Sequence, residues 1–564
     1  MTEFLNNLTK FNSVINDFVW IKIGLVLLIG TGIFMTCFTK FFQLSHIGHW
    51  WRKTIGSVFE KESSTKRKDK DGSVSQFQAL CTALAATLGT GNIAGVSAAI
   101  VVGGAGAVFW MWLAAFFGMM TNFSENVLGI YYRRKNSDGE WSGGAMYYLH
   151  DGLGSLKGCK QIGKILAVLF SIFAILASFG IGNMGQINKI TLNLENAFFS
   201  KFSNTYIFGE VKLMSFIIGI ILMILGGLII LGGLQRIAAF AEKIVPFMAL
   251  AYVIGALVIF VLHIDKLGMM FAIIFKSAFG IKAVGGGVTG VAIKTVMTQG
   301  CKRGVFSNEA GLGSSVMVHS SSNVIEPVKQ GMWGIFEVFA DTIVVCTMTA
   351  VVVLSSGKID LTTGLAIKGT NDATLVADAF ANVFGPFGKY FVAIAMLMFA
   401  FTTVLGWSHY GSKAVEYLLG LKATKVYRVI FVLTIVLGSI LTSSIAWDIS
   451  DTFNGLMMIP NLIGVLALSP VVSKITKNYV NRKIKGKDEE PVLMTLKSRE
   501  HRPLRLQEAK NKISEHYKGA AASGNSYLML RHLIFYKYSC SSYNRLTTLI
   551  KLNFFYFLFW NPAL

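Results

Sequence analysis

A short polar interruption lies in the middle of a long apolar segment in the first half of the chain. Its residues are Leu88, Gly89, Thr90, Gly91 and Asn92. Glycine weakens a helix and the two polar side chains compete for its backbone hydrogen bonds, so we expect a broken helix. Such a break exposes N–H groups at the start of its second half and carbonyl groups at the end of its first, which suits an anion beside a cation. Close helix packing through small residues is the alternative.

A second interruption of the same kind lies in the other half of the chain. The stretch from Ser307 to Ser315 contains Asn308, Glu309, Gly311 and Gly313. Paired interruptions in the two halves of a membrane protein are the sequence signal for a transporter's substrate site. A capped helix start in a loop, with Glu309 beside the helix N-terminus, is the alternative.

Three further polar residues lie inside apolar runs. Thr402 and Thr403 precede Trp407 by about one turn, and Asn183 follows a glycine-containing stretch. Threonine hydroxyls often bond their own helix, and an amide in a membrane helix often bonds a neighbouring helix, so alone these residues indicate little. Beside free carbonyls, neutral hydroxyl oxygens favour a monovalent hard cation, sodium, over calcium.

The elements that must position these residues are membrane helices. The 564 residues are 53% hydrophobic and 15% charged, with a mean hydropathy of +0.56, which predicts an all-α polytopic membrane protein. Most Lys and Arg residues behind the net charge of +22 lie between apolar runs or in the C-terminal tail, which indicates membrane topology rather than nucleic-acid binding. The six cysteines form no C-x-x-C pair, so neither a zinc site nor a disulfide framework is expected.

The apolar runs predict about 11 spans, namely one extra N-terminal helix followed by two sets of five. They lie at about 18–37, then 76–101, 106–132, 163–188, 213–235 and 236–263, and finally 303–325, 330–355, 388–418, 425–446 and 450–473. The expected organisation is an extra helix and basic loop (1–75), a first repeat (76–263), an external interfacial connector (264–302), a second repeat (303–475) and a basic, disordered tail (476–564).

The positions of basic residues predict the orientation. The stretch from Arg52 to Lys70, the loop from Arg133 to Lys160 and the stretch from Lys474 to Lys487 fall on one side of this count, so we expect them in the cytoplasm. The N-terminus is then outside and the C-terminus cytoplasmic, in the inner membrane. Because each set has an odd number of helices, the second set enters the membrane from the side opposite to the first set, as a five-plus-five inverted repeat requires.

Four motifs in order resemble a known family. They read FQALCTALAATLGTGNIAGVSAAI from Phe77 to Ile100, GGAMYYL from Gly143 to Leu149, RGVFSNEAGLGS from Arg303 to Ser314, and GWSHYGSKAVEYLLG from Gly406 to Gly420. Together they resemble the alanine or glycine:cation symporter family, the sodium:alanine symporters, over about residues 10–485. The resemblance implies a leucine-transporter-like fold with broken helices at the substrate site.

The resemblance also implies a set of site residues. It places the substrate carboxylate at the amides of Thr90 and Gly91, and the rest of the pocket is formed by Asn92, Asn183, Leu312 and Trp407. The sodium ion is expected among Ala85, Leu88, Phe399, Thr402 and Thr403. The tail after about Lys487 departs from the family's short charged end, and we interpret its last sixty or so residues as a shifted reading frame or a truncated-gene artefact.

The expected function is secondary active symport of a small neutral amino acid, of the alanine or glycine class, with sodium as the coupling ion. The expected partners are that amino acid, sodium and the lipid bilayer, and no cofactor is expected. An ion channel is one alternative, since it also passes ions. A membrane-embedded enzyme is another, but we find no G-x-S-x-G, no G-x-x-x-x-G-K-[ST] and no histidine-rich metal set.

Overall fold

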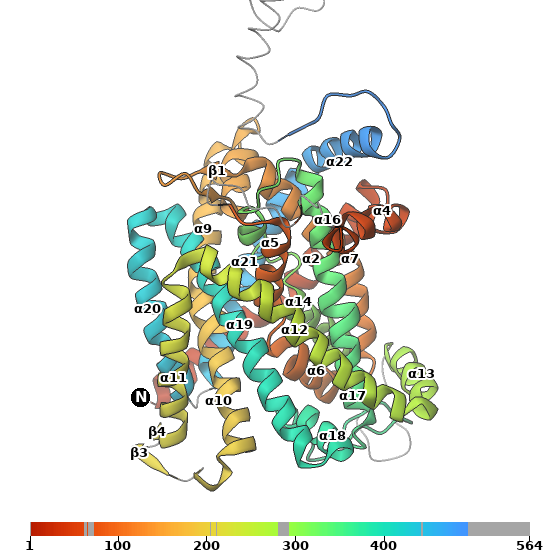
Figure 1. Ribbon diagram of the computed structural model, residues 1–564, viewed down its shortest axis with the longest axis vertical. Helices are drawn as coiled ribbons and strands as arrows, with labels where there is room; N and C mark the ends of the chain where they lie inside the picture. The colour runs from red at the N-terminus through yellow and green to blue at the C-terminus, as the bar shows by residue number, and fades with distance from the viewer. Residues whose placement is uncertain are drawn as a thin grey trace, which may run out of the picture. The chain divides into compact units, whose positions relative to one another are not determined.

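The computed structural model describes residues 2–60, 65, 73–202, 205–209, 211–279, 293–441 and 444–493. The described chain is almost entirely helical, and its long helices run roughly along one direction (Figure 1). Most of the expected basic loop after Glu60, part of the expected connector and the tail beyond 493 lie outside the described residues.

The N-terminal part forms one long helical segment and a series of short helices. The long segment comprises α1 (Thr2–Asp17), the π-helix η1 (Phe18–Gly24) and α2 (Leu25–Phe38). It is followed by α3 (Phe42–Ser45), α4 (Ile47–Trp51) and the π-helix η2 (Arg52–Gly56). The extra N-terminal helix that the sequence predicts is therefore present.

The next part, up to the connector, contains the following elements. They are α5 (Gln76–Thr87), η3 (Gly91–Gly95), α6 (Val96–Gly103), α7 (Ala107–Tyr132), β1 (Arg134–Lys135), β2 (Trp141–Ser142), α8 (Ala145–Tyr147), η4 (Tyr148–Gly152), η5 (Leu153–Ser155), α9 (Lys160–Phe179), η6 (Gly180–Met184), α10 (Gly185–Phe198), η7 (Ser200–Phe202), β3 (Tyr206–Phe208), β4 (Val211–Lys212), α11 (Leu213–Ile230) and α12 (Gly233–Leu262). Both strand pairs, β1–β2 and β3–β4, are short antiparallel hairpins.

The remaining elements begin with the connector. They are η8 (Ile264–Lys266), α13 (Leu267–Ser277), α14 (Ile293–Asn308), α15 (Val316–His319), α16 (Pro327–Val338), η9 (Phe339–Cys346), α17 (Thr347–Ser355), α18 (Leu375–Phe384), α19 (Pro386–Leu419), α20 (Leu421–Ile440), α21 (Ser444–Ala467) and α22 (Ser469–Lys483). α14 begins ten residues before the boundary at 303 that hydropathy suggests, so the stretch 293–302 belongs to this helix and not to the connector.

The number of candidate spans is lower than expected from the sequence. In the described part of the chain, eight helices are long and apolar enough to cross a membrane, or up to ten if each of two bent pairs is one span. The expected count of about 11 is thus not confirmed. α14 is not among the candidates because it has only 16 residues, among them Lys294, Lys302 and Arg303.

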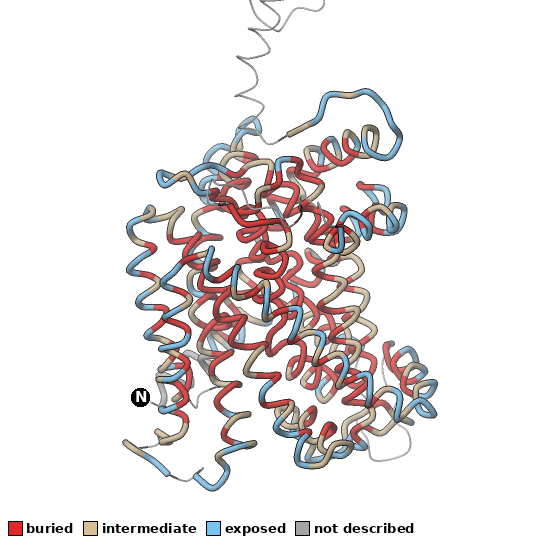
Figure 2. The backbone as a smooth tube through the Cα atoms, in the orientation of Figure 1, coloured by how far each residue is buried: buried red, intermediate tan, exposed pale blue. Residues whose placement is uncertain are grey.

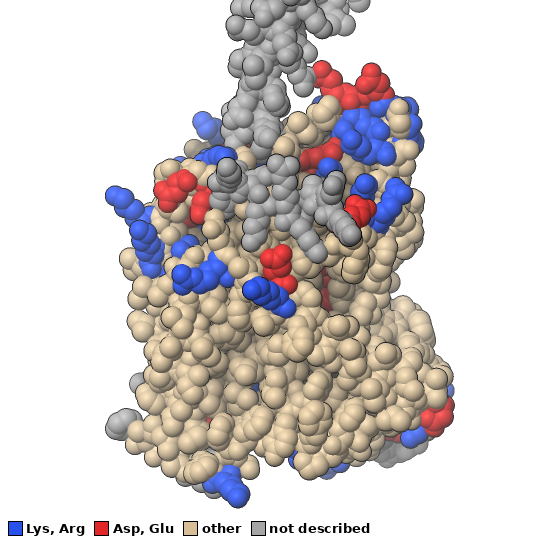
Figure 3. All heavy atoms as spheres, viewed as in Figure 1, with Lys and Arg blue, Asp and Glu red and all other residues tan. Residues whose placement is uncertain are grey.

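The distribution of polarity is that of a membrane protein. Large apolar side chains such as Leu228, Phe247 and Leu250 are more than 60% exposed on the outer helices α11 and α12. The interior instead buries polar residues, including Asn92 and Asp341. Buried residues gather in the middle of the helical bundle and exposed ones at its ends and on its outer helices (Figure 2). Lys, Arg, Asp and Glu gather mainly toward the two ends and leave a nearly uncharged band between them (Figure 3). Such a surface suits hydrocarbon rather than water.

Candidate functional site

The first predicted interruption is a true break. α5 ends at Thr87, Leu88 has ψ 84° outside the helical range, and the following segment from Gly91 to Gly103 is bent by 52° from α5. Asn92 stabilises the break, since its Oδ1 accepts a hydrogen bond of 2.9 Å from the N–H of Gly89. The amide therefore replaces a helix carbonyl that the broken turn cannot supply.

The second predicted interruption is also non-helical. α14 ends at Asn308, and α15 begins only at Val316. Between them Gly311 and Gly313 have φ of 92° and 73°, and Glu309 has φ of 57°, a left-handed conformation that is rare for residues other than glycine. Both segments on which the predicted mechanism depends are thus unwound. Helix packing through small residues does not account for the first, and Glu309 of the second directly follows the C-terminal end of α14 instead of capping a helix start.

The two breaks lie against each other. A Cβ atom added to Gly91 would lie 3.0 Å from the ring of Phe306 and 3.2 Å from Cα of Ser307, so the backbones meet without room for a side chain. Asp341 of η9 joins them, because one of its carboxylate oxygens accepts hydrogen bonds from Asn92 Nδ2 at 2.7 Å and from Ser307 Oγ at 3.1 Å. The buried carboxylate therefore fixes both interrupted segments relative to one another.

A small cavity opens between these breaks and α19. It is lined by Ala86, Thr87, Gly89, Gly91, Ile181, Gln186, Phe306, Glu309, Thr403, Trp407 and Asn454. Its free volume of about 10 Å³ is close to the smallest that can hold one water molecule. The walls must therefore separate before a ligand of amino-acid size can enter.

Backbone and hydroxyl oxygens converge at one edge of this cavity. Thr403 Oγ1 lies 3.2 Å from the carbonyl oxygen of Ala85, 3.5 Å from that of Leu88 and 3.1 Å from that of Phe399. A hydroxyl donates only one hydrogen bond, so it cannot satisfy three carbonyls at once. The cluster is rich in acceptors and poor in donors, which is the environment that a cation stabilises.

Thr402, the other predicted hydroxyl ligand, has different neighbours. Its Oγ1 lies 2.9 Å from the carbonyl oxygens of both Met398 and Phe399, and 3.7 Å from the sulfur of Met248 on α12. It shares the Phe399 carbonyl with Thr403 but does not contact the first break. Ala85, Leu88, Phe399 and Thr403 thus come together, and Thr402 lies beside them.

The predicted pocket residues are divided between the cavity and its surroundings. Gly91 and Trp407 line the cavity, whereas Thr90 and Asn92 stabilise its wall. Asn183 lies elsewhere, since its Nδ2 donates to the carbonyl of Phe431 at 2.8 Å and to Thr434 Oγ1 at 3.0 Å on α20. The buried Leu312 packs in the apolar core and does not line the cavity.

Two cavity residues carry polar groups that the sequence analysis did not single out as ligands. The Oε1 of Gln186 accepts a hydrogen bond of 3.2 Å from the backbone N–H of Thr90. The side-chain oxygen of Gln186 therefore occupies the position where the substrate carboxylate is expected. Glu309 accepts from Trp407 Nε1 at 2.9 Å and from Ser314 Oγ at 2.5 Å. Gln186 is a single polar residue in an apolar run, which forms no pattern, whereas Glu309 lies in the second interruption and its position there was the available signal.

Glu309 has no cationic partner among the described residues. Its two hydrogen bonds come from a neutral indole and a neutral hydroxyl, and its side chain is almost fully buried. A buried carboxylate without an opposite charge is costly, and a cation that enters the cavity removes that cost. The cavity thus combines a wall of backbone amides with a carboxylate, which matches the two charges of a zwitterion.

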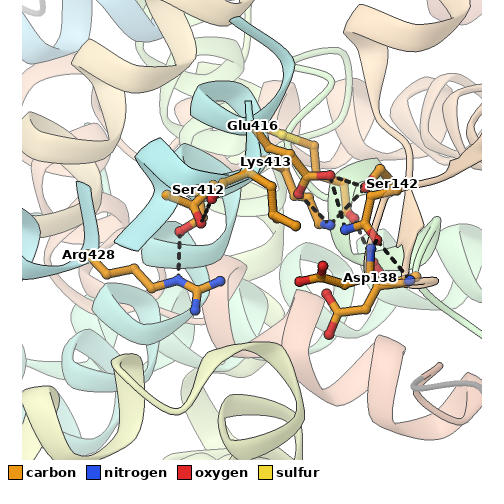
Figure 4. Close-up of polar contacts among 12 residues, drawn as sticks. Asp138, Ser142, Ser412, Lys413, Glu416 and Arg428 are labelled. Atoms are coloured by element: carbon orange, nitrogen blue, oxygen red, sulfur yellow. Dashed lines mark hydrogen bonds and ion pairs between the residues drawn. The ribbon is translucent and has the colours of Figure 1, made fainter. Parts of the chain in front are cut away.

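The far end of α19 is held by polar contacts to the hairpin β1–β2 (Figure 4). Lys413 and Glu416 form a buried ion pair of 2.9 Å on α19. Ser142 of β2 joins it, because its hydroxyl accepts from Lys413 Nζ at 3.1 Å and donates to Glu416. The helix that carries Thr403 and Trp407 is therefore fixed to the loop between α7 and α8.

A family model described as the sodium:alanine symporter family matches residues 5–493. The chain belongs to the sodium:alanine symporter family. The match spans both breaks, the cavity and the oxygen cluster, and it confirms the resemblance carried by the four sequence motifs. The chain is accordingly a multi-pass membrane protein and a sodium-coupled amino-acid symporter.

Two similar proteins bear names that specify different substrates. The sodium/alanine symporter AgcS of Methanococcus maripaludis is 43% identical over 470 residues, which cover 83% of this chain and 96% of that protein. The probable sodium/glutamine symporter GlnT of Bacillus subtilis is 36% identical over 477 residues, covering 84% and 91%. Among solved structures, that of MhsT in complex with L-phenylalanine matches with a TM-score of 0.47 and 15% identity, covering 72% of this chain and 99% of that one.

Proposed function

We propose that this family member imports a small neutral amino acid of the alanine or glycine class with sodium, by alternating access. The observation that carries the proposal is the position of the oxygen cluster around Thr403 directly beside the cavity at the first break. An ion bound there lies next to the substrate, so that each can raise the affinity of the other. The 43% identity to a sodium/alanine symporter supports the choice of amino acid.

In the proposed mechanism the substrate carboxylate binds at the amides of Thr90 and Gly91 after Gln186 moves aside. The ammonium group then faces Glu309, and Trp407 limits the length of the side chain. Sodium binds among the carbonyls of Ala85, Leu88 and Phe399 and the hydroxyls of Thr402 and Thr403. Asn92 contributes by holding the break, while Asn183 and Leu312 support the walls at a greater distance.

The proposed architecture is a leucine-transporter-like five-plus-five inverted repeat preceded by the extra N-terminal helix. Its two halves are residues 76–263 and 303–475, the second extended back to Ile293 where α14 begins, and each has an interrupted helix at its start, as the two breaks support. Rocking of one bundle against the rest exposes the cavity to each side in turn, without ATP. The end of the molecule with α4 and α22 carries many Lys and Arg residues, which supports a cytoplasmic position for that end (Figure 3). We propose that the protein lies in the inner membrane with its N-terminus on the outer side.

Counterflow in proteoliposomes tests the proposal. We expect labelled alanine to accumulate in vesicles preloaded with unlabelled alanine when sodium is present, and not when potassium replaces it. Glycine, serine and glutamine as competitors define the side-chain limit. An ion current that needs no amino acid and does not saturate would identify a channel instead.

Replacing Glu309 by glutamine tests the proposed ammonium contact. We expect Glu309→Gln to raise the KM for alanine about tenfold to a hundredfold, because a hydrogen bond to a charged group contributes about 1.5–3 kcal/mol. Initial uptake rates over a range of alanine concentrations measure the change. Glu195→Gln is the control, since Glu195 is equally buried but pairs with Lys212 away from the cavity. An unchanged KM in Glu309→Gln would assign the ammonium group to other ligands.

A further inference from the structure

A second, larger cavity lies among α4, η2, α16 and α22. Its volume is about 470 Å³, within the range of small-molecule sites, and it shares no lining residue with the cavity at the two breaks. The charged residues of its wall are Arg52, Lys53, Lys329, Lys483 and Glu60. Among the described residues of the wall four cations face a single carboxylate, so this part of the cavity attracts anions.

The four cations are not neutralised within the described chain. None of the ion pairs among the described residues includes Arg52, Lys53, Lys329 or Lys483. Three of them project from separate elements, since Arg52 belongs to η2, Lys329 to α16 and Lys483 to α22. Like charges brought together by three elements repel one another and raise the local concentration of anions, and an anion bound among them relieves the repulsion.

The helix N-terminus beside the cavity also favours an anion, whereas His49 adds no charge of its own. Gln76 lines the cavity and is the first residue of α5, so the partial positive charge of that helix N-terminus faces the same space. His49 forms a hydrogen bond of 3.1 Å with the hydroxyl of Tyr479. Burial and the charges of Lys53 and Arg52 lower the pKa of His49, so its ring stays neutral near pH 7 and leaves the anion to the four cations.

The surface around the cavity indicates the source of that anion. Large apolar side chains beside it are exposed, namely Ile47 of α4 at 55% and Phe59, in the stretch after η2, at 83%. Trp51 packs edge-on against Phe336 and Phe339 and is still 43% exposed. Apolar and aromatic side chains next to Lys and Arg are typical of helices that lie at the membrane interface. This surface favours a lipid headgroup over a free anion as the ligand of the cavity.

We propose that this cavity binds the headgroup phosphate of an anionic phospholipid, with Arg52, Lys53, Lys329 and Lys483 as its cationic partners. The acyl chains lie along the apolar side chains of α3, α4 and the stretch after η2. The lipid joins α4, α16 and α22 at the N-terminal end of α5, which is the first half of the broken helix. Basic cavities of this kind between membrane helices suit phosphate headgroups.

The test measures the thermal unfolding midpoint of the purified full-length protein in detergent, with added phosphatidylglycerol, phosphatidylcholine or inorganic phosphate. We expect only phosphatidylglycerol to raise the Tm. In the double variant Arg52→Ala/Lys483→Ala its apparent affinity should fall at least about tenfold, because charged hydrogen bonds are lost. The matched control is Lys422→Ala/Lys425→Ala, which removes two exposed cations elsewhere and should respond as the unmodified protein does.

Three results would overturn the proposal. The first is an equal response of the cavity variant and the control variant. The second is equal stabilisation by phosphatidylcholine, which would indicate apolar contact alone, and the third is equal stabilisation by inorganic phosphate, which would indicate a free anion. Native mass spectrometry of the unmodified protein is independent of any variant's folding. It should retain phosphatidylglycerol in preference to phosphatidylcholine at equal concentration, and no preference would count against the site.

Discussion

Replacing Thr403 by valine is expected to raise the sodium concentration needed for half-maximal amino-acid uptake about tenfold to a hundredfold, while the protein still reaches the membrane. Valine has nearly the shape of threonine, so packing against the first break changes little. The hydroxyl is lost from the cluster formed with the carbonyls of Ala85, Leu88 and Phe399. Removal of one ligand oxygen from a cation costs about 1.5–3 kcal/mol, which corresponds to a tenfold to hundredfold weaker sodium affinity.

The measurement is alanine uptake in proteoliposomes as a function of sodium concentration. The control is Thr191→Val, because Thr191 is also buried and also lies close to a carbonyl one turn earlier, that of Ile187 at 2.9 Å. We expect the control to keep its sodium dependence. If Thr403→Val kept the same half-saturating sodium concentration, the ion would have to bind elsewhere.

Asn92→Ala is expected to have an equally large effect for a different reason. The Asn92 amide accepts from Gly89 and donates to Asp341, so alanine leaves a buried N–H and a buried carboxylate oxygen with fewer partners. Each such group costs about 1–3 kcal/mol, and the break loses the contact that joins it to Ser307 through Asp341. We expect uptake to be lost and the Tm in detergent to fall.

Uptake and Tm are measured on the same purified preparations, so that loss of transport is compared with loss of folded protein. Asn193→Ala is the matched control, because the amide of Asn193 bonds only the Lys189 carbonyl of its own helix among the described contacts. It should transport normally. Normal uptake by both Asn92→Ala and Thr403→Val would remove the assigned site altogether.

The positions of both breaks could be predicted from the sequence because their cause is local. Glycine, threonine and asparagine within apolar runs weaken helices wherever they occur, and the unwound stretches lie where Gly89, Gly91, Gly311 and Gly313 predict them. The start of α14 could not be predicted in this way. Its first turns are polar, with Lys294 and Thr298, so hydropathy gives no boundary at Ile293.

The difference between Asn183 and Gln186 has a geometric origin. Both are polar residues of one apolar run, and sequence spacing alone does not say which faces the site. The structure has a π-helical turn at Gly180–Met184, which widens the helix and rotates the residues that follow relative to an α-helix. Asn183 consequently faces α20, whereas Ile181 and Gln186 line the cavity. Such a turn depends on tertiary packing and has no sequence signature.

Asp341 and Glu309 illustrate a second limit. Asp341 lies alone in an apolar run and Glu309 lies in the second interruption, and only tertiary structure reveals that Asp341 joins the two breaks and that Glu309 bonds the indole of Trp407. The charge of one residue is visible in the sequence, but its partners come from helices far away along the chain. The sequence thus predicts where the backbone of the site is unwound, but it does not predict which side chains contact one another there.

The attachment of the hairpin β1–β2 to α19 couples movement of the proposed ion site to movement of the hairpin. Thr403 and Glu416 are separated by thirteen residues of a single helix, or about 20 Å, and a helix of that length turns as a rigid rod. Any tilt that follows sodium binding must either carry the hairpin along or rupture the contacts of Ser142 with Lys413 and Glu416. Asp138 is exposed at the hairpin tip, so a fluorophore attached to a cysteine at this position would be in water. In both cases its signal would change when sodium binds at Thr403.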